Sequence, residues 1–283
     1  MFKVIVENFR GERLQLTQNP DYNITTISGL NPPKANINTA TNATFDGSVF
    51  KSSKVNERNI VLNIVIERNI EKNRIALYKY FPTKKNVRMT VQNGTRDVFI
   101  IGYVESFEIN QFDKKQVAQI SLVCPKGYFS ASEESVSDMS AVVGLFEFPF
   151  YSNEGEGFEF SEILLERETN IINIGDVATG LVIRFHANGE VSDPSFYNVT
   201  TGAKIKVNID LAAGDDLIIN TNKGEKSVTL VSAGVSTNVL NDLDLSSEWL
   251  LLEPGDNIFL YTAESGGDVC ECFVSYNVLY EGI

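Results

Sequence analysis

Apolar and polar residues alternate along much of the first 130 residues, which is the pattern of half-buried β-strands. The run 60–66 is apolar on both faces except at Asn63, so we expect a central strand covered on both sides. An apolar stripe with helical spacing follows at 70–81, with Asn69 placed to cap it and Pro82 after its end. These patterns predict a β-sheet domain with one packed α-helix. Its other predicted strands are residues 2–6, 13–30, 87–92, 97–109 and 116–124.

Residues 31–59 break this pattern. They are rich in Asn, Thr, Ser and Lys, with only scattered apolar side chains, and a polar connection of this length is uncommon inside a compact domain. We interpret the segment as an extended arm, a hairpin that turns at Asp46-Gly47 and reaches another subunit. A floppy surface loop is the alternative that the sequence leaves open. For the arm, the expected contact residues are Asp46, Gly47, Phe50, Val55 and Arg58.

The composition changes at residues 130–140, which are rich in Ser, Glu and Ala, and we place a domain boundary there, giving domains 1–132 and 133–283. Beyond it no segment has a helical pattern. Many short strands separated by Gly, Asn and Asp turns predict an antiparallel β-sandwich. The expected strands are residues 145–151, 157–166, 169–174, 180–187, 203–211, 216–220, 226–231, 249–252, 257–262 and 271–280.

The stretch 246–261 contains the only tryptophan of the chain. Its two apolar runs flank Pro254-Gly255, a pair suited to the centre of a type II turn, so the stretch predicts a β-hairpin. Alternation places Trp249 and Leu251 on one face of the first arm. An indole on a β-sandwich can stack on a sugar, but large aromatic side chains in alternating strands are usually buried. We therefore predict that Trp249 and Leu251 belong to the core.

The composition, 43% hydrophobic and 22% charged over 283 residues, is that of an ordinary globular protein, and no apolar run approaches the ~20 residues that a membrane helix needs. The N-terminus has no signal-peptide pattern, so we expect synthesis in a cytoplasm, where Cys124, Cys270 and Cys272 remain reduced. One Cys-x-Cys pair and a single distant histidine cannot supply the four ligands of a zinc site. We predict no bound metal and no cofactor.

Charge is distributed unevenly between the two regions. Residues 1–130 contain 18 Lys and Arg against 11 Asp and Glu, whereas residues 131–283 contain 6 against 26. The acidic region would repel nucleic-acid phosphates, and the basic region has no cluster of Lys and Arg with interleaved aromatic residues. Direct recognition of nucleic acid is therefore not expected.

Candidate catalytic groups are few. The only imidazole, His186, falls on a predicted solvated strand face with Arg184. Acidic pairs at Asp215-Asp216 and Asp242/Asp244 lie in turn-like contexts, where Asp side chains normally bond nearby backbone amides. Phosphate-binding loops, nucleophile elbows and zinc-protease motifs are absent from the sequence. We predict that the protein is not an enzyme.

Two series of short motifs occur in an order and spacing that span nearly the whole chain. The first series is Gly29-Leu30-Asn31-Pro32-Pro33, Asp46-Gly47-Ser48, Arg58-Asn59-Ile60, Leu77-Tyr78-Lys79-Tyr80-Phe81 and Leu122-Val123-Cys124-Pro125 with Tyr128-Phe129. The second is the run 173–180, Leu211-Ala212-Ala213-Gly214-Asp215 and the stretch 246–257. Together the two series resemble the distal tail proteins (Dit) of long-tailed phages and prophages of Gram-positive bacteria.

This resemblance implies a ring-forming N-terminal domain of sheet and helix with a belt-like arm, and a C-terminal galectin-like β-sandwich. It also implies a homo-hexameric hub at the virion tail tip, assembled in the host bacterial cytoplasm. The implied partners are the major tail protein on one side and a tail-associated lysin or fibre protein, with receptor-binding proteins, on the other. The rival hypotheses are a carbohydrate-binding module that adheres to the host cell wall and, with less support, a wall hydrolase.

Overall fold

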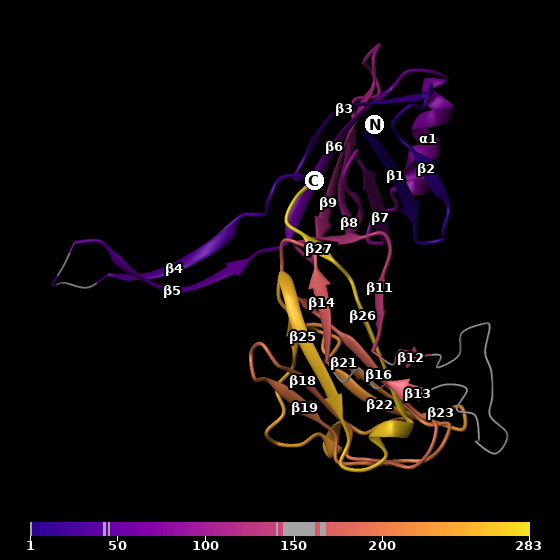
Figure 1. Ribbon diagram of the computed structural model, residues 1–283. Helices are drawn as coiled ribbons and strands as arrows, with labels where there is room; N and C mark the ends of the chain where they lie inside the picture. The colour runs from indigo at the N-terminus through magenta and orange to yellow at the C-terminus, as the bar shows by residue number, and fades with distance from the viewer. Residues whose placement is uncertain (1, 42–43, 45, 140, 144–161, 165–167) are drawn as a thin grey trace, which may run out of the picture. The chain divides into compact units, whose positions relative to one another are not determined.

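A computed structural model describes the chain except for residue 1 and residues 42–43, 45, 140, 144–161 and 165–167. The described residues are mostly strand, with one α-helix (Figure 1), which confirms the predicted mainly β fold class. They divide into two compact units. Unit 1 comprises Met1–Ser132 together with Leu279–Ile283, and unit 2 comprises Glu133–Val278. The assignment of all of 133–283 to the second domain was therefore wrong for the last five residues, which return to unit 1.

Unit 1 is built on a nine-stranded antiparallel sheet. Its main order is β2-β1-β7-β8-β9-β6-β3, and β10 pairs with both β8 and β27. The strands are β1 (Lys3–Asn8), β2 (Arg13–Gln15), β3 (Tyr22–Ser28), β6 (Arg58–Ile66), β7 (Asn86–Gln92), β8 (Asp97–Ile109), β9 (Val117–Cys124), β10 (Phe129–Ala131) and β27 (Leu279–Tyr280).

One face of this sheet forms the core of unit 1. Alternate residues of the strands point into it, and Leu77 and Phe81 join them from the end of α1 (Ile70–Tyr80), so the helix covers this face. In β6, Ile60, Leu62 and Ile64 are buried, whereas Val61 and Asn63 are only half-buried. The prediction of a strand covered on both sides therefore holds only near its end, where Val65 is buried, because Asn59, Val61 and Asn63 on the other face remain at least partly exposed.

The helix begins and ends within one residue of its predicted limits, but its first turn is not capped as expected. Asn69 has a left-handed backbone, with φ of 43°, and its side chain makes no capping hydrogen bond. Instead the Asn73 side-chain amide donates to the Arg68 carbonyl at 2.6 Å. No helix in the described part of the chain is long and apolar enough to cross a membrane.

Unit 2 contains two main antiparallel sheets that face one another. The six-stranded sheet has the order β11-β26-β16-β21-β22-β23 and the four-stranded sheet the order β14-β25-β18-β19. Phe185 from the first and Tyr261 from the second have ring centroids 6.4 Å apart, and Phe196 stacks on Phe259 at 5.1 Å. The predicted β-sandwich is therefore present in the described residues of unit 2.

The strands of the six-stranded sheet are β11 (Ser135–Asp138), β16 (Val182–Ala187), β21 (Asp216–Asn220), β22 (Ser227–Ser232), β23 (Val235–Asn238) and β26 (Cys270–Tyr276). Those of the four-stranded sheet are β14 (Glu168–Asn173), β18 (Ser195–Asn198), β19 (Lys204–Lys206) and β25 (Gly255–Thr262). Three small pairs join β12 (Ala141–Val143) to β13 (Glu162–Leu164), β15 (Thr179–Gly180) to β24 (Leu251–Leu252), and β17 (Val191–Ser192) to β20 (Asp210–Leu211). Short 3-10 helices are η1 (Leu240–Asp242) and η2 (Gly267–Val269). The predicted strands at 145–151 and 157–166 lie outside the described residues, apart from β13.

The stretch 246–261 is not a hairpin. Its first arm, β24, pairs with β15, whereas β25 pairs with β14 and β18. Gly255 does adopt the expected positive φ, at 93°. The bend is held by Asn257, whose side-chain amide donates to the carbonyls of Glu253 and Gly255 at 2.7 and 2.9 Å. The turn chemistry was therefore predicted correctly and the strand pairing was not.

Candidate interaction site

The arm is a two-stranded antiparallel hairpin of β4 (Ala35–Thr41) and β5 (Ser48–Val55). In the described residues the two strands pair only with each other (Figure 1). Almost every side chain on them is exposed. An isolated two-stranded hairpin is marginally stable in water unless another surface covers one face. The hairpin is therefore the first candidate for an interaction site.

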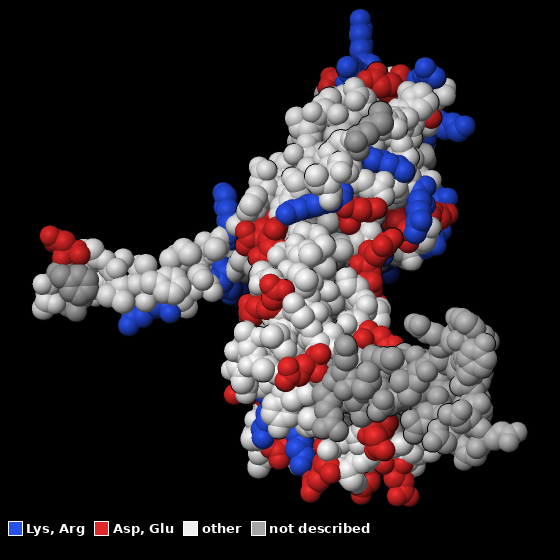
Figure 2. Space-filling model, viewed as in Figure 1, with Lys and Arg blue, Asp and Glu red and all other residues white. Residues whose placement is uncertain are grey.

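The register gives the arm two different faces. Ala35 and Ile37 on β4 share one face with Phe50 and Val55 on β5. Ile37 is 57% exposed and Phe50 60% exposed. Lys51, at the register shift between Asn38 and Thr39, is exposed, and most of the arm's visible surface is uncharged (Figure 2).

The opposite face of the arm carries Ala40 and the 45% exposed Val49 towards the tip and is otherwise polar. Its side chains bond to one another across the strands, from Asn36 to Asn56 at 3.1 Å and from Asn38 to Ser52 at 3.0 Å. Lys54 is exposed on the same face. An amphipathic hairpin of this kind satisfies its own polar groups on one side and leaves the apolar side for a partner.

The predicted contact residues separate into two groups. Asp46 and Gly47 are exposed at the arm tip, Phe50 lies on the apolar face, and Val55 is half-buried near the base. Arg58 is only 4% exposed, so its prediction as an interface residue was wrong. Its neighbours Glu57 and Asn59 are exposed, which made the sequence resemble a surface segment.

Arg58 instead binds the root of the arm, the segments 27–34 and 56–62 through which the hairpin joins the sheet of unit 1. Its guanidinium donates four hydrogen bonds to backbone carbonyls: Nε to Gly127 at 2.9 Å, Nη1 to Gly29 at 2.5 Å and Asn31 at 2.7 Å, and Nη2 to Glu281 at 2.5 Å. The guanidinium also lies over the Phe129 ring, 4.6 Å from its centroid. Burial lowers the pKa of Arg58, and the four charge-assisted bonds offset part of that cost.

Glycines allow the chain to approach Arg58 closely. Gly29 has a φ of +88°, and a Cβ there would lie 2.2 Å from the Asn59 carbonyl oxygen. A Cβ at Gly127 would lie 2.8 Å from the Asn56 carbonyl oxygen. The outgoing and returning ends of the arm are therefore packed backbone against backbone, so the exposed hairpin has a closely packed root.

Trp249 is half-buried, and it does not share a face with the core. Leu250 and Leu252 are 2% and 0% exposed, whereas Leu251 is 45% exposed. The predicted core pair, Trp249 and Leu251, therefore has the wrong phase of alternation. The Lys226 ammonium lies over the indole, 4.9 Å from the ring centroid. Since an amine already occupies the space above the ring, the geometry does not favour Trp249 as a sugar platform.

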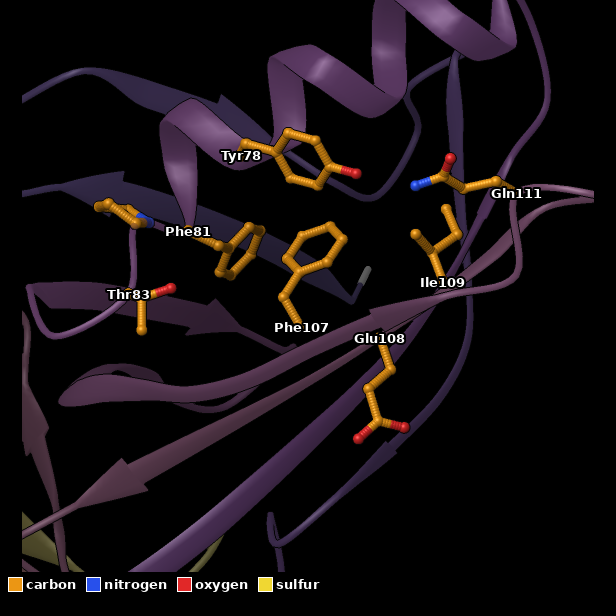
Figure 3. Close-up of a pocket in the computed structure, with 8 residues that line it drawn as sticks. Tyr78, Phe81, Thr83, Phe107, Glu108, Ile109 and Gln111 are labelled. Atoms are coloured by element: carbon orange, nitrogen blue, oxygen red, sulfur yellow. The ribbon is translucent and has the colours of Figure 1, made fainter.

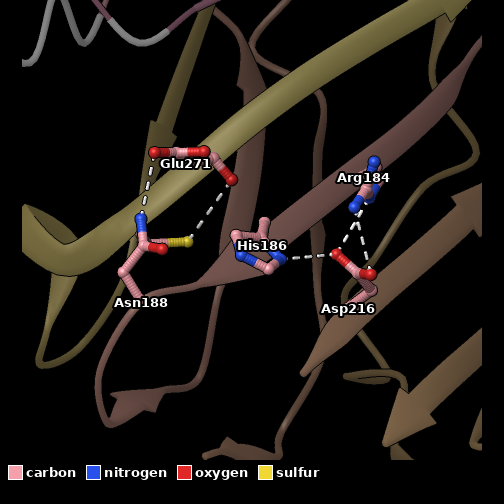
Figure 4. Close-up of polar contacts among 6 residues, drawn as sticks. Arg184, His186, Asn188, Asp216 and Glu271 are labelled. Carbon is pink, nitrogen blue, oxygen red and sulfur yellow. Dashed lines mark hydrogen bonds and ion pairs between the residues drawn. The ribbon is translucent and has the colours of Figure 1, made fainter. Parts of the chain in front are cut away.

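Of the residues considered for catalysis, His186 and Asp216 form a polar cluster with Arg184 on the outer face of the six-stranded sheet (Figure 4). Asp216 accepts hydrogen bonds from Arg184 Nε and contacts His186 Nδ1, each at 2.8 Å. Burial alone would raise the pKa of Asp216, but the bonds from Arg184 and His186 outweigh it and lower that pKa. Asn188 bonds to Glu271 at 3.0 Å. The cluster is a set of satisfied cross-strand pairs, and the Asp216 carboxylate is held ionised, unsuited to act as a general base near neutral pH.

No described group of three or more His, Cys, Asp and Glu side chains is arranged to hold a metal ion. The three thiols are buried and unlinked. Burial raises the pKa of Cys124 and of Cys270 to about 12, so neither is a thiolate at neutral pH.

A groove of about 550 Å³ lies in unit 1 beside the end of α1 (Figure 3). Tyr78 and Phe107 meet edge to face in it, with ring centroids 4.9 Å apart. Apart from the Tyr78 hydroxyl, the polar side chains that line the groove are Thr83, Glu108 and Gln111. The groove has neither a nucleophile with an adjacent base nor a cluster of charges, so the arm remains the stronger candidate site.

Comparisons with known proteins cover both units. Residues 9–124 match the phage tail protein RIFT-related domain, and residues 174–280 match the C-terminal domain of the siphovirus-type tail component. The chain belongs to the distal tail protein family of siphovirus-type tails. This family is a structural component of the phage tail and baseplate and not an enzyme, which confirms the predictions of family and of a non-catalytic role.

Solved distal tail and baseplate proteins share the fold. The crystal structure of phage SPP1 Dit, described as a paradigm of the hub adsorption apparatus in phages that infect Gram-positive bacteria, has a TM-score of 0.70 at 12% identity, over 99% of each chain. A chain of the phage P2 baseplate, in its activated conformation with Ca, has a TM-score of 0.52 at 10% identity, over 97% of this chain and 98% of that one. No curated protein matches the sequence. As a tail component, the protein is located in the virion tail and associates with other tail proteins.

The sequence predicted the arm but missed the root. Arg96 and the last five residues were not singled out, although they bond to one another and to the arm base. The only signal at the C-terminus is a second short apolar run after Asn277, which resembles a continuation of the preceding strand.

Proposed function

We propose that six copies of this chain form a closed ring at the tail tip, and that the arm of each copy packs its apolar face on the next copy. The ring joins the tail tube, through the major tail protein, to a tail-associated lysin or fibre protein and to receptor-binding proteins. The observation that carries the proposal is the uncovered apolar face of the arm, on a chain whose family and fold are those of a tail hub. One repeated head-to-tail contact closes a ring when its rotation divides a full circle.

The two units have different roles in this proposal. Unit 1 forms the ring, and unit 2, a galectin-like β-sandwich, lies at the periphery. The charge difference supports this arrangement, because residues 131–283 carry 26 acidic against 6 basic side chains and repel one another less when they are kept apart. The ring assembles in the bacterial cytoplasm before it joins the tail.

The arm contact is strong enough to test by substitution. Burying the exposed 60% of Phe50 removes on the order of 120 Å² of apolar surface from water, about 3 kcal/mol for each contact. Loss of this term weakens association about 100-fold. The double variant Ile37→Ser and Phe50→Ser removes the apolar face, and Ala40→Ser with Lys54→Ser is the matched control on the opposite face.

Native mass spectrometry and electron micrographs of assembled tails measure the outcome. We expect the six-copy mass and ring-shaped tail tips for the wild type and the control, and monomers for the apolar-face variant. Deletion of residues 36–56 should likewise abolish rings while both units stay folded. Rings that form normally without the arm would refute the arm contact, and tails with no ring of this protein at their tip would refute the hub.

A further inference from the structure

The last five residues of the chain complete unit 1 at the root of the arm. Strand β27 pairs with β10, with Phe129 opposite Tyr280 and Ser130 opposite Leu279. Residues 133–278 are therefore inserted between the two strands of a hairpin that belongs to unit 1. A chain that ended after unit 2 would contain both β-sandwich sheets and the whole arm but would lack β27.

We propose that residues 279–283 are a latch that fixes the arm at its root, so that only a chain synthesised through residue 283 presents the arm in the orientation that a ring requires. The link to ring formation rests on the proposed function of the arm, whereas the latch itself does not. The proposal makes Arg58 and Arg96 positioning residues for the arm.

Arg58 is the first half of the latch. Its Nη1 binds the outgoing end of the arm at Gly29 and Asn31, and its Nη2 binds the Glu281 carbonyl at 2.5 Å. Arg58 itself begins β6 and so belongs to the returning end. One guanidinium thus joins both ends of the arm to the C-terminus. Without Glu281, Nη2 of Arg58 loses its carbonyl partner, although the Arg58 residue is only 4% exposed.

Arg96 is the second half of the latch. It donates to the Gly282 carbonyl and lies over the Tyr280 ring, 4.3 Å from the centroid. The last residue then bonds directly to the arm root, because the Ile283 amide donates to the Leu30 carbonyl at 3.1 Å. A Cβ at Gly282 would lie 3.1 Å from the Leu30 oxygen and from Pro32 Cδ, so this segment lies against the outgoing chain.

These contacts make the arm root the last part of unit 1 to be completed. Synthesis proceeds from the N-terminus and domains fold as their residues emerge, so the arm and unit 2 are made before residues 279–283. Until then both ends of the arm lack the Glu281, Gly282 and Ile283 partners. An incomplete chain therefore holds its arm less firmly, and a contact that must order its arm on binding is weaker than one whose arm is already ordered. The latch excludes truncated subunits from the ring.

The test compares four proteins: the wild type, a chain ending at Val278, Arg58→Lys and the control Arg10→Lys. Hydrogen exchange is measured in peptides that cover residues 27–34 and 56–62, together with the mass of the assembly. Lysine keeps the charge of Arg58 but cannot form the four-bond fork. Truncation and Arg58→Lys should each raise exchange at the arm root about 10- to 100-fold, as expected for the loss of one charge-assisted hydrogen bond, and should reduce rings. Arg10→Lys should change neither.

Hydrogen exchange at the arm root tests the latch itself, and the mass of the assembly tests its link to ring formation. Unchanged exchange at the arm root in both the truncated chain and Arg58→Lys overturns the latch, whatever the assembly state. Increased exchange with wild-type rings keeps the latch but overturns its link to assembly, and a wild type that never forms rings refutes the proposed function while exchange still tests the latch. Should truncation unfold all of unit 1, Gly282→Val decides, because it displaces the latch without removing Arg58 or β27. It should raise exchange at the root, and wild-type exchange in that variant overturns the proposal.

Discussion

Two adjacent leucines of unit 2 give the sharpest test of its packing. Leu252 is 0% exposed and Leu251 is 45% exposed, so the same substitution at the two positions should have very different effects. Leu252→Ala removes three buried carbon atoms and leaves a cavity, at a cost of about 2–5 kcal/mol. Leu251→Ala removes atoms that are largely in water already, and surface substitutions cost about 0.5 kcal/mol or less.

The difference is measurable by thermal unfolding. For a unit of this size, 1 kcal/mol shifts Tm by about 2–4 °C, so 3 kcal/mol for Leu252→Ala lowers Tm by about 10 °C. Leu251→Ala should stay within about 2 °C of the wild type. The fluorescence of Trp249, the only tryptophan, reports on unit 2 directly and can be followed in both variants. Equal shifts, or a larger one for Leu251→Ala, would show that the opposite phase is correct and that Trp249 and Leu251 face the core.

Two further predictions concern titratable groups. The three buried thiols, two with a pKa of about 12, should resist alkylation by iodoacetamide at pH 8 in the native protein and react fully in urea, and rapid native modification of any one would contradict their burial. Because its hydrogen bonds lower the folded-state pKa of Asp216 below its usual 3.8, its contribution to stability is complete above that pH and is lost as the pH falls through the lowered pKa. Unfolding of Asp216→Asn by urea should therefore depend less steeply on pH below 4 than unfolding of the wild type, and identical pH profiles would show that this carboxylate carries no such contribution.

The sequence predicted the positions of the helix and strands better than it predicted which strands pair. The helix at 70–81 and the strand at 216–220 are specified by local spacing and by bounding residues such as Pro82 and Gly214, and the structure has them within one residue. The pairing of β24 with β15 joins residues about seventy positions apart, and no turn residue encodes it. The Pro-Gly turn was therefore visible in the sequence, whereas the choice of partner strand depends on the packing of the whole sandwich.

The two errors in the predicted site, at Trp249 and at Arg58, have separate causes. A run of three leucines has no polar residue to set the phase of alternation, so Trp249 was assigned to the core by its size alone, while contacts of Leu252 and Asn257 decide the phase. Arg58 lies between exposed Glu57 and Asn59, and it is buried because carbonyls from residues 29, 31, 127 and 281 converge on it. Convergence of distant backbone groups leaves no local pattern that a sequence reader could detect.

The arm combines an exposed apolar hairpin with an ordered base, and this combination is informative about its role. A floppy loop would not need a buried arginine with four hydrogen bonds and two glycines in close backbone contact at its ends. Fixing the ends during folding means that less conformational entropy is lost when the apolar face meets its partner, which strengthens the contact without adding area. The same rigidity limits the directions that Phe50 and Ile37 can face, so a single repeated contact specifies one rotation between neighbours. In the ring proposed above, this fixed rotation must divide a full circle, because a repeated contact with any other rotation would produce an open helical assembly.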